Sequence, residues 1–202
     1  MNAASRLIAS ASALLVITAC AISPPSNRPD HPQVLLLMVE GGGFGSGVVI
    51  ADDWIVTCAH CTPVAFAGDL PATHQIPHPF LDLALVKVPG VKSNGLRFGS
   101  SPKLYDRLFA YGFHLADHFL KTEGYQGGRP DLMSCPIIHG CSGGAVVDSR
   151  GDLVGIIAYV IYTGTANGFD GYALPHISGY TPIGDTERQW IADQIELNTP
   201  AK

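Results

Sequence analysis

The sequence predicts an all-β protein with one terminal helix. Short apolar runs of strand length alternate with turns, and the 202-residue chain contains 23 glycines and 15 prolines. Charged residues make up only 14% of the chain, and long helical periodicity is almost absent. The length suffices for one domain or for two small barrels that share a cleft. The formal net charge is −5, and the lack of a basic stripe argues against a nucleic-acid partner.

Four apolar segments of strand length occupy the first half of the mature chain, and turn signals separate them. The turns fall at glycines 41–43, at 52–53 and at 89–90, because glycine, aspartate and proline favour turn geometry. The predicted strands are Val34 to Glu40, Ser46 to Ile50, Trp54 to Thr57 and Leu81 to Val88.

The second half predicts further strands and one helix. Asp185 and Thr186 are expected to cap a helix over about 185–197, whose apolar face carries Trp190, Ile191 and Ile195. The two halves extend over about 33–92 and 103–183 within a domain of about 33–200. The predicted strands are 108–113, 121–126, a hairpin of 145–148 and 153–162 around a turn at 149–151, and 171–174, closed by Pro175.

Residues 1–19 have the composition of an export signal rather than of a folded element. Their apolar run, 7–19, is too short to span a bilayer as a stable helix. The motif at 17–20 resembles a bacterial lipobox, which predicts lipidation of Cys20 and anchoring at the bacterial cell envelope. The alternative is ordinary cleavage there, which would give a soluble secreted or periplasmic protein. Residues 20–32 contain four prolines and are predicted to form an extended tether.

A glycine-rich turn at 140–144 carries the candidate nucleophile, Ser142. A serine hydroxyl is a weak nucleophile until a neighbouring base removes its proton. Gly140 and Gly143 allow the backbone to bend so that the amides of Gly140 and Ser142 point into one small space, as an oxyanion hole requires. The alternative interpretation is an ordinary surface turn rich in glycine and serine.

His60 and Asp82 are the candidate base and its orienting carboxylate. His60 follows an apolar strand, and a free histidine has a pKa near 6.5, which suits proton transfer near neutrality. Asp82 lies in the apolar run 80–86, where a carboxylate is costly unless it is paired. We expect Asp82 to accept the second N–H of His60, and activity to fall below about pH 6. The alternatives are a structural histidine and a solvent-facing aspartate at a strand edge.

In the chain order His60, Asp82, Ser142, these segments resemble the chymotrypsin-like (trypsin-fold) serine proteases in their compact bacterial form. The resemblance covers nearly all of the mature chain. It implies two six-stranded antiparallel β-barrels with the cleft between them and a C-terminal helix. It also implies a serine endopeptidase that forms an acyl-enzyme with this triad. The matching segments are 45–47, 55–61, 82–85, 140–144, 151–156 and 171–175, of which the last two are similar to HtrA-type peptidases.

The cysteines depart from the family pattern. Cys141 stands where secreted digestive members carry an aspartate that pairs with a newly cut N-terminus, so the resemblance implies no such activation step. Cys61 matches a cysteine that many relatives bridge to one just before the Gly-Ser-Gly segment, where this chain has Phe44 and no cysteine. Together with Cys58 and Cys135, these thiols could pair in several ways or stay reduced. Zinc at the C-x-x-C spacing is the alternative, and we predict no metal and no cofactor because the intervening histidine has a better use.

The resemblance also predicts which residues line the primary specificity pocket. Most of them are apolar, which favours a small or aliphatic residue before the scissile bond. An aspartate at the bottom of the pocket would instead select Lys or Arg. Ala158 falls where relatives often place a hydroxyl that supports the triad carboxylate. The predicted lining residues are Pro136, His139, Ala158, Tyr159, Val160 and Asp170.

The sequence therefore predicts a serine endopeptidase that acts on proteins or peptides and is attached to a membrane through lipidated Cys20. Two other classes of protein stay open. A protease-shaped binding protein with little turnover is suggested by Ala158 and Cys141, and a metal-binding envelope lipoprotein is suggested by the cysteines. His114 is expected to be an ordinary loop residue.

Overall fold

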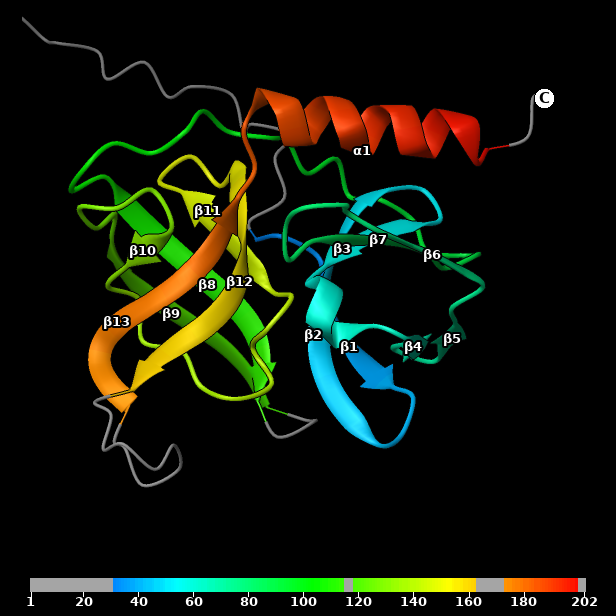
Figure 1. Cartoon of the computed structure of the whole chain (residues 1–202), viewed down its shortest axis with the longest axis horizontal. Helices are drawn as coiled ribbons and strands as arrows, with labels where there is room; N and C mark the ends of the chain where they lie inside the picture. Colours follow the sequence, from blue (N-terminus) through cyan, green and yellow to red (C-terminus); the bar gives the residue numbers. More distant parts are fainter. Residues whose placement is uncertain (1–30, 115–117, 163–172, 200–202) are drawn as a thin grey trace, which may run out of the picture.

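The computed structural model describes residues 31–114, 118–162 and 173–199, which form two curled antiparallel sheets and a C-terminal helix (Figure 1). The predicted all-β fold class is confirmed. The predicted signal segment, Cys20 and Asp170 lie outside the described residues. No helix in the described part of the chain has both the length and the apolar character needed to cross a bilayer.

The first sheet contains seven strands in the order β5-β4-β1-β2-β3-β7-β6. All neighbours pair antiparallel, and a tight turn at Asp53, whose φ is 62°, joins β2 to β3. Asp tolerates this left-handed conformation better than most side chains do. The strands are β1 Val34–Val39, β2 Gly43–Ala51, β3 Trp54–Thr57, β4 Val64–Ala67, β5 Leu70–Pro71, β6 His74–Pro77 and β7 Ala84–Lys87.

The second sheet contains six strands in the order β10-β13-β12-β11-β8-β9. The predicted hairpin is present as β11 and β12, joined through a turn at Gly151, whose φ is 81°. Figure 1 shows this sheet beside the first one, with β2 and β12 near the line where they meet. The strands are β8 Arg107–His114, β9 His118–Tyr125, β10 Leu132–Met133, β11 Ala145–Asp148, β12 Leu153–Tyr162 and β13 Ala173–Pro182.

Both faces of the central strands are buried, which explains why they are continuously apolar in the sequence. In β7, Leu85 joins an apolar cluster between the two sheets, whereas Val86 joins the interior of the first sheet. In β3, Val56 faces the shared cluster and Ile55 faces the same interior as Val86. Because successive strand residues point to opposite faces, each strand contributes to two cores.

The first sheet has one strand more than the six predicted, and its short strands were not predicted individually. β4, β5 and β6 are two to four residues long, and Pro71 and Pro77 end two of them. Strands this short carry little of the alternating apolar pattern from which sequence assignments are made.

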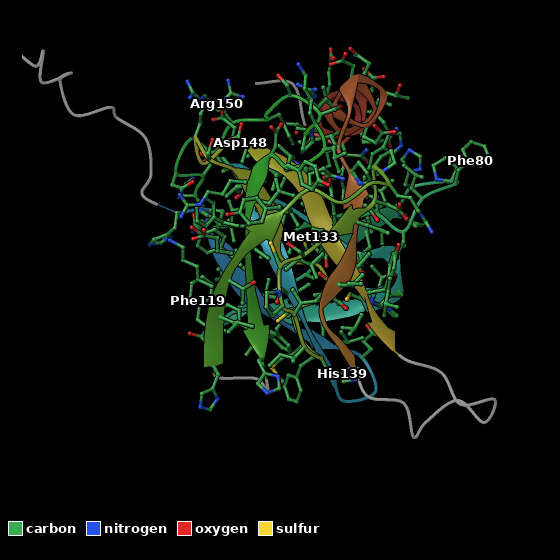
Figure 2. All side chains as sticks on the ribbon, turned by 90° about the vertical axis from the view of Figure 1, so that its left-hand side faces the viewer. Phe80, Phe119, Met133, His139, Asp148 and Arg150 are labelled. Atoms are coloured by element: carbon green, nitrogen blue, oxygen red, sulfur yellow. The ribbon has the colours of Figure 1, made fainter. Side chains whose placement is uncertain are left out.

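Several strand boundaries also differ from the prediction, and two of these differences affect the surface or the pairing of the strands. The last strand continues to Pro182 instead of ending at Pro175, because the pairing of β12 with β13 shifts between Val160 and Tyr162. A register shift of this kind accommodates a proline, which cannot donate to a ladder. The strand expected from residue 81 begins only at Ala84, so Phe80 projects from the surface and is 89% exposed (Figure 2).

The helix α1, Asp185–Leu197, packs against the first half of the chain. Its N-cap is Gly184, whose N–H donates to the Glu187 carboxylate at 2.8 Å, so the cap lies one residue before the predicted one. Trp190 meets the ring of His78 edge-on with 4.7 Å between centroids. Ile191 is buried in the cluster shared by the two sheets. Residues from the end of the chain therefore help to hold the two halves together.

We predict that Leu85→Ala lowers the free energy of unfolding by about 2–5 kcal/mol, because Leu85 is fully buried between the sheets. Urea unfolding monitored by circular dichroism measures the change. Leu104→Ala is the matched control, since Leu104 is 53% exposed, and its effect should stay within about 0.5 kcal/mol. Equal effects of the two substitutions would contradict the packing described above.

Candidate active site

The pairing of β3 with β7 brings His60 and Asp82 together. Thr57, at the end of β3, lies opposite Ala84, at the start of β7. The turns that continue from these two strand ends are therefore neighbours. His60 lies in a short 3₁₀ turn, Ala59–Cys61, and Asp82 lies in the bend before β7.

The carboxylate of Asp82 binds His60 through two hydrogen bonds. The His60 ring Nδ1 donates to Oδ2 at 2.6 Å, and the His60 backbone N–H donates to Oδ1 at 2.9 Å. The hydrogen bond to Asp82, followed by the one to Cys61, raises the pKa of His60 above its ordinary value. Burial opposes ionisation of Asp82, but the bonds from His60 lower its pKa overall. This contact fixes the ring so that Nε2 is the nitrogen left to accept a proton.

Ser142 reaches the same cleft from the turn that precedes β11. A cleft of about 280 Å³ is lined by His60 and Ser142 together with side chains from the second half. The Ser142 hydroxyl donates to the carbonyl of Ala158 at 3.4 Å, and no hydrogen bond joins it to His60 within the described residues. Catalytic hydrogen bonds are often long in an enzyme without substrate and tighten on binding.

The turn around Ser142 leaves two backbone amides free. Cys141 N–H donates to Ile138, and Gly143 N–H donates to Ile157. The amides of Gly140 and Ser142 find no acceptor among the residues that the structure describes. Two unpaired amides beside a serine hydroxyl are the arrangement that an oxyanion hole requires.

Close packing explains the glycine at 143. Its φ is +84°, and a Cβ at this position would lie 1.9 Å from the carbonyl oxygen of Ser46 and 2.1 Å from Oγ1 of Thr57. A side chain there would clash with rigid backbone, so the turn can only be built with glycine.

Ser46 is a buried residue that holds the Ser142 turn and whose role the sequence did not reveal. Its N–H donates to the Ser142 carbonyl at 2.7 Å, and its Oγ donates to the Gly140 carbonyl at 3.0 Å. The same Oγ accepts the N–H of Phe113, and the Ser46 carbonyl accepts the Thr57 hydroxyl at 2.7 Å. A polar residue inside a buried apolar strand was the available signal.

His114 holds the other end of this turn, so it is more than the loop residue expected from the sequence. Its Nδ1 lies 2.9 Å from the carbonyl oxygen of His139, and because a carbonyl only accepts, Nδ1 is the donor. In a trans peptide the C=O and the next N–H point in opposite directions. Holding the His139 carbonyl toward β8 therefore turns the Gly140 N–H away from β8. Figure 2 shows His139 at the end of the molecule opposite the turn of Asp148 and Arg150.

The cleft beside Ser142 contains most of the predicted pocket residues. His139, Ala158, Tyr159 and Val160 line it. Pro136 does not line it, because Ile137 and Ile138 occupy that wall.

Tyr159 is held in this lining by two contacts. Its hydroxyl donates to Asp131 at 2.7 Å. Its ring lies directly over Gly179, where a Cβ would come within 2.0 Å of the ring.

A larger hollow of about 650 Å³ lies elsewhere, between Glu40, Pro63 and His74. It contains neither His60 nor Ser142. We therefore assign the candidate site to the smaller cleft, since the reactive groups converge there.

All four described cysteines are buried free thiols. The residue that faces Cys61 is Gly45 rather than Phe44, because a Cβ on Gly45 would lie 3.0 Å from the Cys61 sulfur. Donor atoms of Cys58, His60 and Asp82 lie within 4.8 Å of one another, the one such grouping among the described residues. Two of these three are already bonded to each other, and the absence of a metal or cofactor stays a prediction.

The fold is that of the serine peptidases built from two curled antiparallel sheets. A sequence profile of the trypsin-like peptidase domain matches residues 45–156, which is more than half of the chain. The chain belongs to the trypsin-like peptidase family. A search of curated proteins found no match.

Solved structures share the fold at low sequence identity. The inactive form of the Rv3671c protease, from M. tuberculosis H37Rv, is 21% identical, with a TM-score of 0.61 over 80% of this chain and 88% of that one. The HtrA-type protease AlgW with a decapeptide is 23% identical, with a TM-score of 0.61 over 75% of this chain and 51% of that one. AlgW with a tripeptide is 22% identical, with a TM-score of 0.62 over 81% and 60%. The chain thus corresponds to about half of the AlgW chain.

We predict that His114→Ala lowers kcat for a peptide substrate about 10-fold and leaves KM nearly unchanged, because a misaligned Gly140 amide weakens transition-state binding. Steady-state kinetics measure both constants. His114→Gln keeps a side-chain donor and should restore much of kcat, whereas His74→Ala, at an exposed position, should have no effect. A change in KM alone would show that His114 does not orient the amide.

We predict that the acidic limb of the pH profile of kcat/KM lies above pH 6.5, which is higher than the sequence suggested. The reason is that the raised pKa of His60 keeps this residue protonated up to a higher pH. Cys61 is the second cause of that shift, so Cys61→Ala should move the limb toward lower pH. Identical limbs in the two proteins would exclude this contribution of Cys61.

Proposed function

We propose that the protein is a serine endopeptidase that hydrolyses peptide bonds through an acyl-enzyme. The observation that carries this proposal is the His60–Asp82 pair, which faces Ser142 across one cleft. Ser142 Oγ attacks the substrate carbonyl while His60 Nε2 takes its proton, and the amides of Gly140 and Ser142 stabilise the resulting oxyanion. His60 then protonates the leaving amine. Water, activated by the same histidine, hydrolyses the ester and releases Ser142.

Peptides are the proposed substrates. The AlgW structures with a decapeptide and with tripeptides show that a protein of the same fold binds such ligands. In this chain the cleft wall is mostly apolar and includes Ile137, Ile138 and Val160. These side chains favour a small or aliphatic residue before the scissile bond. Attachment to a membrane through Cys20 is likewise a proposal that rests on the sequence alone.

A protease-shaped binding protein is the second candidate, and one observation favours it. The Ser142 hydroxyl points to the Ala158 carbonyl instead of to His60. A fluorophosphonate discriminates between the two functions, since it reacts covalently only with an activated serine.

We predict that a fluorophosphonate labels the wild-type protein at Ser142 and that Ser142→Ala abolishes both labelling and cleavage of unfolded casein, by at least about 10³-fold. Mass spectrometry locates the label, and the increase in fluorescence as dye-labelled casein is cleaved reports activity. Ser149→Ala, at an exposed turn, is the control and should behave like wild type. A folded wild-type protein that stays unlabelled and inactive would favour the binding protein.

A further inference from the structure

Two thiols flank the candidate base on a single tight turn. The Cys61 N–H donates to the Cys58 carbonyl at 3.1 Å, which closes a turn from residue i to residue i+3. Such a turn brings the two Cα atoms within about 7 Å, close to the 4.4–6.8 Å that a disulfide spans. A Cys58–Cys61 bond therefore requires a change in this turn, and His60 lies inside the small ring that the bond would close.

The surroundings of the two thiols differ. Cys58 is fully buried, and its thiol donates to the Ile157 carbonyl at 2.9 Å. Cys61 is 5% exposed, and its thiol lies 3.7 Å from the Ser142 carbonyl. The interaction with the Cys58 thiol, followed by that with His60, lowers the pKa of Cys61 to about 5, whereas the pKa of Cys58 is raised well above its ordinary value. One reactive thiolate beside one protected thiol is the arrangement of a redox-active dithiol.

We propose that Cys58 and Cys61 form a reversible disulfide that switches off the site by displacing the turn of His60. The oxidant is a peroxide, which is small enough to reach a sulfur with 5% exposure. The Cys61 thiolate attacks one peroxide oxygen, the O–O bond breaks, and hydroxide leaves. The Cys58 sulfur then attacks the sulfenic acid, so that the S–S bond forms, the S–O bond breaks, and the Cys58 proton leaves in water.

Oxidation breaks two contacts that join the His60 turn to the second sheet. Cys58 loses its hydrogen bond to Ile157, and the Cys61 sulfur leaves its position 3.7 Å from the Ser142 carbonyl oxygen. The Ile157 carbonyl also accepts the N–H of Gly143, so both contacts end in the backbone around the nucleophile. The disulfide itself is independent of peptidase activity, whereas its effect on turnover rests on the proposed function.

Peptide mapping of the protein after treatment with hydrogen peroxide tests the disulfide. We expect the peptide that contains Cys58 and Cys61 to lose two hydrogens and to regain them with dithiothreitol, in wild type and in Ser142→Ala alike. Cys58→Ser removes the resolving thiol, so Cys61 should accumulate as sulfenic and sulfinic acids. Cys135→Ser is the control and should leave the disulfide unchanged. Burial raises the pKa of Cys135 to about 12, so this thiol stays protonated and takes no part in the oxidation. Unmodified Cys58 and Cys61, or a disulfide to another cysteine, would overturn the proposal.

Activity of the same samples tests the switch. We expect peroxide to lower casein cleavage by wild type at least about 10-fold and dithiothreitol to restore it. This expectation follows from the loss of rate that a small misplacement of a catalytic group causes. Full activity of the oxidised protein would overturn the switch. An inactive reduced protein that still forms the disulfide in Ser142→Ala would instead contradict the proposed peptidase function.

Discussion

The buried contact between Ser46 and the turn of Ser142 is the constraint on which the rest of the site depends. Ser46 belongs to the first sheet, and both carbonyls that it binds belong to the second half. A buried hydroxyl or amide left without a partner would cost about 1–3 kcal/mol, so each of these bonds also fixes a position. The Thr57 hydroxyl and the Phe113 N–H also donate hydrogen bonds to Ser46, and these bonds fix its position. Ser142, the proposed nucleophile, is consequently placed by a residue of the sheet that leads to the proposed base, His60.

The electrostatics of the site follow from the turn of His60. One carboxylate accepts both the ring and the backbone N–H of this residue, which orients the imidazole and stabilises its charged form. The two thiols beside it are close enough to shift the pKa of one another, and Cys61 also shifts the pKa of His60. Protonation of the base and ionisation of Cys61 are therefore linked properties of one small group of atoms.

The sequence was informative where a residue type carries its own chemistry. His60, Asp82 and Ser142 could be singled out because a histidine, a carboxylate and a serine next to apolar or glycine-rich segments need a physical reason. The fold class was also predictable, since the central strands are apolar on both faces.

The supporting residues could not be found in this way. Ser46 and His114 act through contacts with Gly140 and His139, which lie 94 and 25 positions further along the chain. No local pattern encodes such pairs, because the topology of the sheets alone brings them together. The short strands β4 to β6 were missed for a related reason, as they depend on neighbours more than on their own composition.

The strands that carry residues on two faces have a consequence for how this domain comes apart. β3 and β7 supply one wall to the interior of the first sheet and another to the cluster between the sheets. Neither half can lose its order without exposing apolar surface of the other. Amide hydrogens of β3, β7, β11 and β12 should therefore exchange with solvent together, through opening of the whole domain as one cooperative unit. If one molecule cleaves another copy of the same protein, it finds no partly unfolded half to cut.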